Sequence, residues 1–372
     1  MKALIIGGTG PTGPHLISGL NKRGYDVTIF HRGTHEPADL PPARHIHGDP
    51  HFRETIDEAL GSEEFDVVVA AYGRVRLLAE ALAGRCSQFL SVGGVPVYAG
   101  WYEPTTVLPY GTPLPTRESD RLASALDKSD LPSLKFAQLM VRTEEAVWQN
   151  HPTAAVFRYP MIYGPNNPMP WEWMVIKRLL DSRPHMILPD GGIAIYHRCA
   201  ARNAAEFLLR AVDNPEAAAG EAFNVGDEVL WTTRQWVELV MERVGRTMEL
   251  VPLPSDIAVG AAAALSPQAT PLSPHKILSV DKARQLLGYR DVVDPVTALG
   301  ELVDWYLEHP VQDTTTIPAF IDPFDYALED RLITAYARTR GELVREHPQV
   351  VGDGVHGMPH PKVPGGADSR GR

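Results

Sequence analysis

The chain has 372 residues, a length typical of two or three structural units, and 44% of them are hydrophobic. A chain of this size can bury a large core without disulfides or structural metals. Its two cysteines, Cys86 and Cys199, are too few for a disulfide scaffold or a cysteine-rich zinc site. The net charge of −11 argues against general binding to nucleic acid or to an anionic membrane.

The chain shows no targeting or membrane-spanning segment. Its first apolar run, residues 3–6, is too short for a signal-peptide core or a membrane span, and no run of 18 apolar residues follows. We therefore expect a soluble, cytoplasmic protein whose thiols are reduced.

In chain order, short apolar runs alternate with segments of helical periodicity through the first half. Strands are predicted at residues 3–6, 26–30, 44–46, 65–70, 89–92 and 154–158, and helices at 13–23, 52–60, 75–83 and 134–149. This order predicts an α/β fold of the Rossmann type, a doubly wound parallel sheet with helices on both faces.

The second half is less regular. Helices are predicted at 172–181, 200–212, 233–244, 281–287 and 296–308, and short strands at 186–188 and 222–225. We assign residues 1–170 to a dinucleotide-binding domain whose sheet is completed by later segments, and 171–310 to a small C-terminal substrate domain. Residues 311–350 form a helical extension with a charged helix at 329–345. Residues 351–372 have almost no large apolar side chains and are expected to be disordered.

A glycine-rich segment follows the first predicted strand and opens the first predicted helix. It reads Gly7-Gly8-Thr9-Gly10-Pro11-Thr12-Gly13, with Gly7, Gly10 and Gly13 at intervals of three. Glycine lets the backbone approach a pyrophosphate, and the helix N-terminus supplies N–H donors and the positive end of the helix dipole. A tight turn has similar spacing, but the position between strand and helix favours dinucleotide binding.

Together with other segments, this motif resembles the short-chain dehydrogenase/reductase superfamily and, within it, the extended NAD-dependent epimerase/dehydratase family. The other matching segments are His47-Gly48-Asp49, residues 65–71, residues 158–165, Asp281-Lys282-Ala283 and Leu287-Gly288-Tyr289. The resemblance covers residues 1–310 and is not specific to one reaction. It implies that the cofactor is bound by Gly7, Thr9, Gly10, Pro11, Thr12, Gly13, Asp49, Ala71 and Tyr72.

The end of the second predicted strand bears on the choice of cofactor. An NAD-preferring site usually has a carboxylate there for the ribose 2′-OH, whereas this chain reads Phe30-His31-Arg32-Gly33. Arg32 could pair with a 2′-phosphate and stack on adenine, and the alternative is an ordinary loop arginine. We predict NADP(H) as the cofactor, with NAD(H) as the alternative.

The resemblance fails at the catalytic positions. It implies a Tyr and a Lys four residues apart on one helix, where the Lys lowers the pKa of the Tyr. No tyrosine of this chain has a lysine four positions later. Phe136 and Met140 stand at those two positions, and Gly94 stands at the position of the supporting Ser or Thr. We therefore predict that the usual groups are lost and that Tyr72 and Tyr98 are the leading catalytic candidates.

The histidines show no metal-ligand spacing such as His-Glu-x-x-His, so the sequence predicts no metal site. His45 and His47 alternate on a predicted strand, and His51 lies in the next turn. This group is either a solvated loop or a pH-sensitive patch.

Aromatic residues fall in the segments where extended members of the family build the substrate side. They are Trp101, Tyr102, Trp171, Trp173 and Trp231. They favour a flat or apolar ligand, with an ordinary interdomain core as the alternative.

The predicted function is that of an NADP(H)-binding epimerase/dehydratase/reductase-type enzyme that acts on a small, aromatic or apolar molecule. The alternative is a non-catalytic, cofactor-sensing regulator or binding protein. The expected partners are this small molecule and a second copy of the chain in a homodimer, with no nucleic acid and no membrane.

Overall fold

The computed structural model describes residues 1–37, 39–126, 131–265, 274–314, 317, 322, 324–347, 361 and 363–367. Its contacts divide the chain into two compact units, Met1–Phe324 and Asp325–Arg372. Most of the predicted tail at 351–372 lies outside the described residues.

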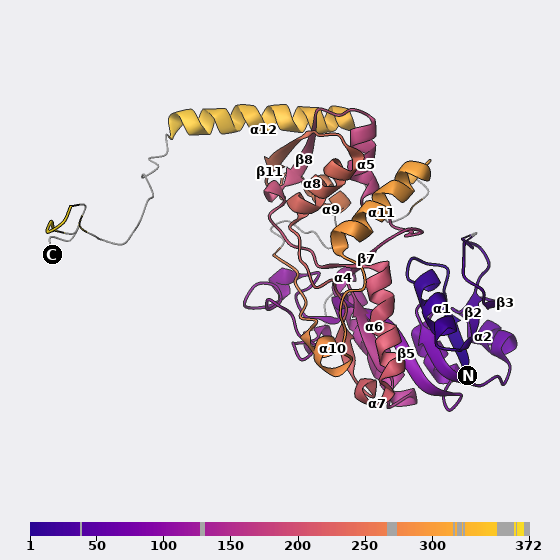
Figure 1. The fold of residues 1–372 in the computed structure, drawn as a ribbon. Coiled ribbons are helices and arrows are strands. Elements are labelled where there is room, and N and C mark those ends of the chain that lie inside the picture. The colour runs from indigo at the N-terminus through magenta and orange to yellow at the C-terminus, as the bar shows by residue number, and fades with distance from the viewer. Residues whose placement is uncertain are drawn as a thin grey trace. The chain divides into compact units, whose positions relative to one another are not determined.

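The first unit contains a parallel seven-stranded sheet with the order β3-β2-β1-β4-β5-β6-β10 (Figure 1). The strands are β1 (Lys2–Ile6), β2 (Asp26–His31), β3 (Arg44–His47), β4 (Phe65–Ala70), β5 (Cys86–Gly94), β6 (Ala155–Tyr159) and β10 (Ala222–Asn224). The predicted Rossmann-type fold is confirmed. The strand order reverses beside β1, and open α/β sheets bind their ligands at the carboxyl ends of the strands at such a point.

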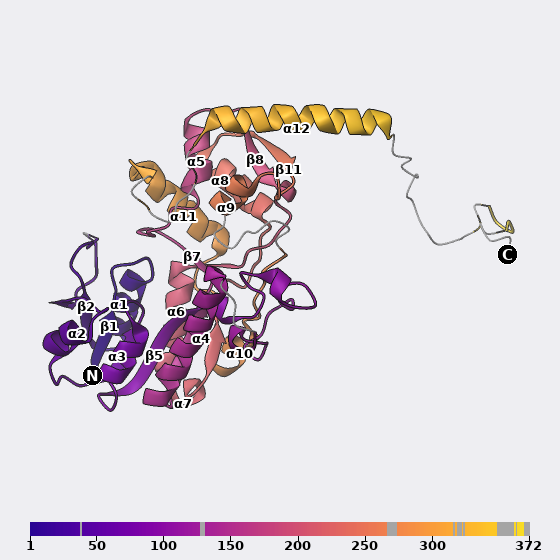
Figure 2. The ribbon, with the colours of Figure 1, turned by 180° about the vertical axis from the view of Figure 1, so that it is seen from behind.

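Both faces of the sheet are buried, because alternate strand residues point to opposite sides. In β1, Ala3 and Ile5 pack into the core shared with α1 (Gly13–Lys22), α6 (Ala201–Asp213) and α10 (Asp281–Leu286). Leu4 and Ile6 pack into the opposite core. That core is shared with α2 (Arg53–Leu60), α3 (Val75–Ala81) and α4 (Pro132–Asn150). Figure 1 shows α1 and α6 in front of the sheet, and the reverse view in Figure 2 shows α3 and α4 in front of it.

A further core lies beyond the carboxyl ends of the strands (Figure 2). Its helices and strands are α5 (Trp173–Leu180), α8 (Thr233–Val244), α9 (Val259–Leu265), α11 (Pro295–Glu308) and the parallel pair β8 (His185–Pro189) and β11 (Glu249–Leu253). The parallel pair β7 (Met161–Tyr163) and β9 (Arg198–Ala200), the helix α7 (Pro215–Ala218) and short 3-10 turns at Val95–Val97, Pro104–Thr106, Ala123–Ala125 and Asp190–Gly192 complete the unit. The sequence did not predict β7, β9 or β11, since a short strand carries little periodicity.

The second unit contains the helix α12 (Tyr326–Glu346), which includes the predicted helix at 329–345. The side chain of Asp325 caps its first turn by accepting a hydrogen bond from Leu328 N. Among the described residues, no helix has the length and apolar character that crossing a membrane would require.

Candidate cofactor site at the carboxyl edge of the sheet

A cavity of about 720 Å³ opens along the carboxyl edge of the sheet. Its wall includes Arg32 after β2, Gly7 after β1, Ala71 after β4, Val92 on β5 and Tyr159 on β6. Neighbouring strands lie about 4.8 Å apart, so the steps from β2 through β1, β4 and β5 to β6 span roughly 19 Å. The cavity is therefore long enough for an extended dinucleotide.

The glycine-rich loop forms the middle of this wall. A Cβ on Gly13 would overlap the carbonyl oxygen of Gly8, so α1 must begin directly against the loop. A Cβ on Gly10, by contrast, would meet no atom within 4 Å, and Gly10 lines the cavity. The space in front of Gly10 is thus open to a ligand, and Thr9, Pro11 and Thr12 line the same stretch. A pyrophosphate fits this cradle of exposed backbone at a helix N-terminus.

The β2 end of the cavity is basic and aromatic. The Arg32 guanidinium lies over the ring of Tyr72, 5.6 Å from its centroid, and both residues line the cavity. His31 and His35 line the same end. Across the described part of the chain, no residue of the cavity wall has a carboxylate. This end suits an anionic group such as a phosphate.

Asp49 lies behind the wall of the cavity. Its carboxylate accepts hydrogen bonds from the Nδ1 of His51 at 2.7 Å and from the backbone N of His51 at 3.0 Å. These two hydrogen bonds, of which the one from the ring has the larger effect, hold the pKa of Asp49 below its usual range. The His51 ring packs edge-on against Tyr72 with centroids 5.0 Å apart. Asp49 therefore adjoins the cavity through His51 and Tyr72, and its predicted contact with adenine stays a prediction.

Tyr98 is buried in the core and does not line the cavity. Its hydroxyl donates to Asn224 Oδ1 at 2.6 Å and accepts from Arg158 Nη1 at 2.9 Å. Arg158 also donates to both carboxylate oxygens of Glu144, at 3.0 and 2.8 Å. Burial raises the pKa of Tyr98 above its usual range. This hydrogen-bond network joins β6, β10 and α4 and holds the Tyr98 hydroxyl in the core. The predicted catalytic role requires that hydroxyl to face the cavity.

The positions where the family resemblance implies catalytic groups also lie outside the cavity wall. The ring of Phe136 is 48% exposed and lies 6.4 Å from the ring of Tyr102. Met140 packs against Gly94, since a Cβ on Gly94 would lie 2.9 Å from Met140 Cε. Of the candidates that the sequence proposed for catalysis, Tyr72 is the one that the fold places on the cavity.

The aromatic residues predicted to line the substrate side are absent from the cavity wall, and one of them, Trp171, is buried. Trp101 and Tyr102 contribute to a core beside α4, and Trp173 and Trp231 contribute to the core around α8. The aromatic residue from the second half that lines the cavity is Trp305 on α11, beside Ile162, Asn166, Asn167 and Pro168. Trp305 was missed because its place in an apolar helical pattern does not distinguish a cavity wall from a core.

Comparison with known proteins identifies the first part of the chain. The model of the NAD dependent epimerase/dehydratase family matches residues 3–99. This segment is similar to the NAD dependent epimerase/dehydratase family. The predicted resemblance to epimerases and dehydratases is thereby confirmed.

The domain has relatives of known sequence and structure. The chain is 27% identical over 321 residues to the chloroplast stem-loop binding protein of 41 kDa b of Arabidopsis thaliana, a match that covers 81% of this chain and 78% of that protein. It superposes on a UDP-glucose 4-epimerase of Thermotoga maritima, solved with UDP-glucose, with a TM-score of 0.63, 18% identity and coverage of 83% and 99%. It also superposes on a dTDP-glucose 4,6-dehydratase of Bacillus anthracis, solved with NAD, with a TM-score of 0.62 and 15% identity. That match covers 83% of this chain and 97% of the other. At these identities the structural matches establish the fold.

Proposed function

We propose that this protein binds NADP(H) in the cavity at the carboxyl edge of the sheet and acts on a small molecule there. The observation that carries the proposal is the β2 end of the cavity, where Arg32 forms part of the wall and no described wall residue has a carboxylate. A 2′-phosphate pairs well with a guanidinium and is repelled by a carboxylate. NAD(H), which lacks this phosphate, is the alternative.

The other parts of the wall match the remaining parts of such a cofactor. The loop from Gly7 to Gly13 lines the cavity and leads into α1, whose N-terminus suits a pyrophosphate. Val92 and Tyr159, on β5 and β6, form the far end of the wall, at the side suited to a nicotinamide. A bound nicotinamide would accept or donate a hydride.

If the chain is an enzyme, its proton exchange must differ from that of the Tyr and Lys that the family resemblance implies. Phe136, Met140 and Gly94 cannot exchange a proton, and they do not line the cavity. Tyr72 lines the cavity and is 39% exposed, but its ring lies under Arg32 at the β2 end, where the 2′-phosphate is proposed to bind. Tyr159 lies at the nicotinamide end, but its hydroxyl donates to Ala204 O at 3.3 Å, and burial raises its pKa well above the usual range. We therefore infer that water or the substrate itself supplies the proton.

The substrate that this wall favours is a small molecule with an apolar or aromatic part. Ile162, Pro168 and Trp305 form an apolar side next to the nicotinamide end. The amide side chain of Asn166 lies in the same stretch of wall and offers a donor and an acceptor for orientation. The alternative function is a cofactor-sensing regulator or binding protein that carries out no turnover.

The first test is calorimetric titration of the full chain with NADPH and with NADH, followed by a panel of small aldehydes and ketones monitored at the absorbance of the reduced nicotinamide. We expect NADPH to bind at least about tenfold more tightly, the effect of one charge-assisted contact. Equal affinity would refute the choice of cofactor. Binding of NADPH without turnover of any panel member would favour the regulator.

A separate titration tests for binding of nucleic acid, because the relative from Arabidopsis is named for binding a stem-loop. We expect no binding of a short RNA stem-loop at physiological salt, because the net charge of −11 repels phosphates. Saturable binding below about micromolar concentration, tighter than typical non-specific binding, would overturn this expectation.

A further inference from the structure

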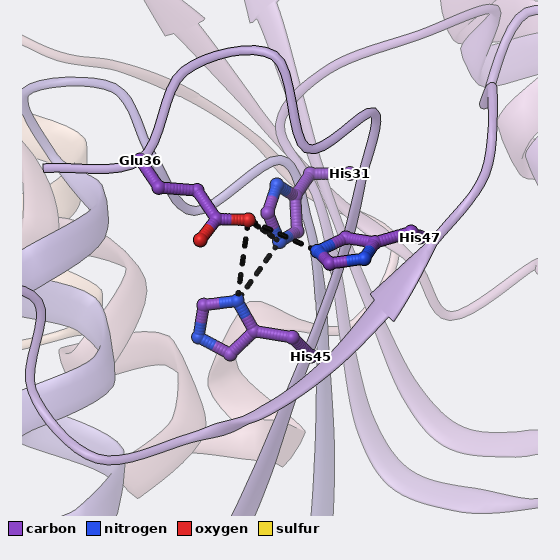
Figure 3. Close-up of side chains that lie close together, drawn as sticks. All are labelled: His31, Glu36, His45 and His47. Atoms are coloured by element: carbon purple, nitrogen blue, oxygen red, sulfur yellow. Dashed lines mark hydrogen bonds and ion pairs between the residues drawn. The ribbon is translucent and has the colours of Figure 1, made fainter.

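Three histidines and one glutamate converge beside the β2 end of the cavity (Figure 3). His31 ends β2, His45 and His47 lie on β3, and Glu36 belongs to the loop that joins the two strands. The parallel register pairs His31 with His47, and His45 lies two residues from His47, so all three side chains point to one face of the sheet. The fold thus assembles a group that the sequence shows only in part.

The geometry of this group is that of a ligand set. One nitrogen from each histidine and one oxygen of Glu36 lie within 4.8 Å of one another. Glu36 Oε1 lies 3.0 Å from His47 Nε2, 3.5 Å from His31 Nε2 and 3.7 Å from His45 Nδ1. His31 Nε2 and His45 Nδ1 are 3.1 Å apart. A tetrahedral zinc ion with bonds of about 2.0–2.1 Å separates its ligand atoms by about 3.3 Å.

We propose that His31, Glu36, His45 and His47 bind a divalent transition-metal ion, with Zn²⁺ the best fit. Imidazole nitrogens and one carboxylate oxygen are ligands that Zn²⁺ accepts, and four of them close a tetrahedral site. Mg²⁺ and Ca²⁺ are disfavoured, because they require mainly oxygen ligands. The four groups now meet in hydrogen-bonded pairs, and an ion at this point would bind all four ligand atoms at once.

Coordination replaces the hydrogen bonds that now join His31 to His45 and His47 to Glu36. It also requires one rearrangement: Gly33 N donates to His31 Nδ1 at 3.3 Å, and coordination through Nε2 transfers the ring proton to Nδ1. This long hydrogen bond is then exchanged for the bond to the metal.

The position of the site gives it a consequence for the cavity. His31 is also part of the cavity wall and directly precedes Arg32. An ion held by His31, Glu36 and β3 ties the loop after β2 to the neighbouring strand. We therefore expect metal binding to order the segment that carries Arg32, and the proposal stands on the four ligands whichever cofactor is bound.

The experiment uses the full chain without a polyhistidine tag, stripped with a chelator and then titrated with ZnCl₂ and, separately, with CoCl₂. We expect one Zn²⁺ per chain with micromolar or tighter affinity and a melting temperature raised by about 3–5 °C at 100-fold excess over Kd. Tetrahedral Co²⁺ should add intense visible absorption that Zn²⁺ then abolishes. Absence of stoichiometric binding of both ions would overturn the proposal.

The variants decide which residues hold the ion. His45→Ala and Glu36→Gln should each weaken binding of Zn²⁺ at least about 100-fold, since removing even an outer partner of a metal ligand costs 10–100-fold. His51→Ala is the matched control, because His51 lies in the next turn but pairs with Asp49 instead of the group. Circular dichroism confirms that each variant is folded. Undiminished binding in folded His45→Ala, or equal loss in His51→Ala, would show that the ion is held elsewhere.

Discussion

The methyl group of Met140 packs directly against the backbone of Gly94, and a Cβ on Gly94 would lie 2.9 Å from Met140 Cε. By resemblance to the epimerase/dehydratase family, these two positions correspond to the Lys and the supporting Ser or Thr. A side chain at position 94 would therefore displace the end of the Met140 side chain.

This contact predicts the stability of a pair of variants. Gly94→Ala should lower the free energy of unfolding by about 1 kcal/mol, the low end of the cost of overpacking, because its Cβ would meet Met140 Cε, the end of a flexible side chain that can shift. The backbone of Gly94 is extended, with φ −153°, so the alanine adds no backbone strain. In the double variant with Met140→Ala the cost of Gly94→Ala should largely vanish. Urea denaturation in a double-mutant cycle measures this, and purely additive costs would contradict the contact.

Arg32 should determine the preference for NADP(H). Arg32→Ala removes the cation at the β2 end of the cavity and should weaken binding of NADPH by about 1–3 kcal/mol, with binding of NADH nearly unchanged. Calorimetry with both cofactors provides the measurement. Arg74→Ala is the control, since its guanidinium lies over Phe52 and Arg74 does not line the cavity. Equal losses for NADPH and NADH in Arg32→Ala would refute the assignment to the 2′-phosphate.

Two glycines of the loop should respond in opposite ways to an added side chain. Gly10→Val places its Cβ in open space, so the melting temperature should stay within about 2 °C while dinucleotide binding is lost. Gly13→Ala should destabilise the fold, because its Cβ would overlap the Gly8 carbonyl oxygen. Thermal unfolding and cofactor titration separate the two effects. Wild-type cofactor affinity in Gly10→Val would show that the loop is only a turn.

Tyr72 and Tyr98 should differ in what their hydroxyl groups do. On any substrate that is found, Tyr72→Phe should leave kcat within a few-fold, because the Tyr72 ring lies under Arg32 at the β2 end of the cavity and not at the nicotinamide end. Tyr98→Phe should leave kcat within a few-fold but cost about 1–3 kcal/mol of stability, because Asn224 Oδ1 and Arg158 lose a buried partner. Steady-state turnover and urea denaturation of both variants distinguish the roles. A loss of kcat of about 10²-fold or more in either variant, the usual worth of general acid–base help, would contradict these roles.

His197 should contribute to loss of stability in acid. Its Nε2 donates to Asp227 O at 2.9 Å and its Nδ1 accepts from Leu278 N at 3.0 Å, so the buried ring is neutral. Burial lowers its pKa to about 4, against about 6.5 in the unfolded chain. Below pH 6.5 the unfolded chain therefore takes up a proton that the folded chain does not. The contribution of His197 to the free energy of unfolding should therefore fall by about 1.4 kcal/mol per pH unit as the pH drops towards 4.

Comparison with His197→Gln isolates this contribution from those of other groups. Asp227 acts in the opposite direction, because burial raises its pKa to about 6 and favours the folded state as the pH falls. Urea denaturation between pH 7.5 and 5 should show that His197→Gln is less stable than the wild type at pH 7.5. The variant should also lose less stability than the wild type as the pH falls to 5. The same loss in both proteins would mean that His197 does not remain neutral.

The sequence by itself determined the features that depend on neighbouring residues. The alternation of apolar strands with periodic helices predicted the parallel sheet, and the spacing of Gly7, Gly10 and Gly13 between a strand and a helix located the loop that lines the cavity. The absence of a carboxylate next to Arg32 could be read directly. These signals are local, since backbone geometry fixes the period of strands and helices and only glycine leaves the space that a cofactor needs.

Tertiary structure alone decided which distant residues meet. Tyr98 follows β5 and looked available for catalysis, but its hydroxyl bonds to Asn224, 126 residues away in the sequence. Trp305 reaches the cavity from α11, and pairing of β2 with β3 brings His31 to His47 and Glu36. Helical or strand periodicity shows that a side chain is buried but not what it is buried against. That choice is made by the packing of whole elements, through close contacts between residues far apart in the chain.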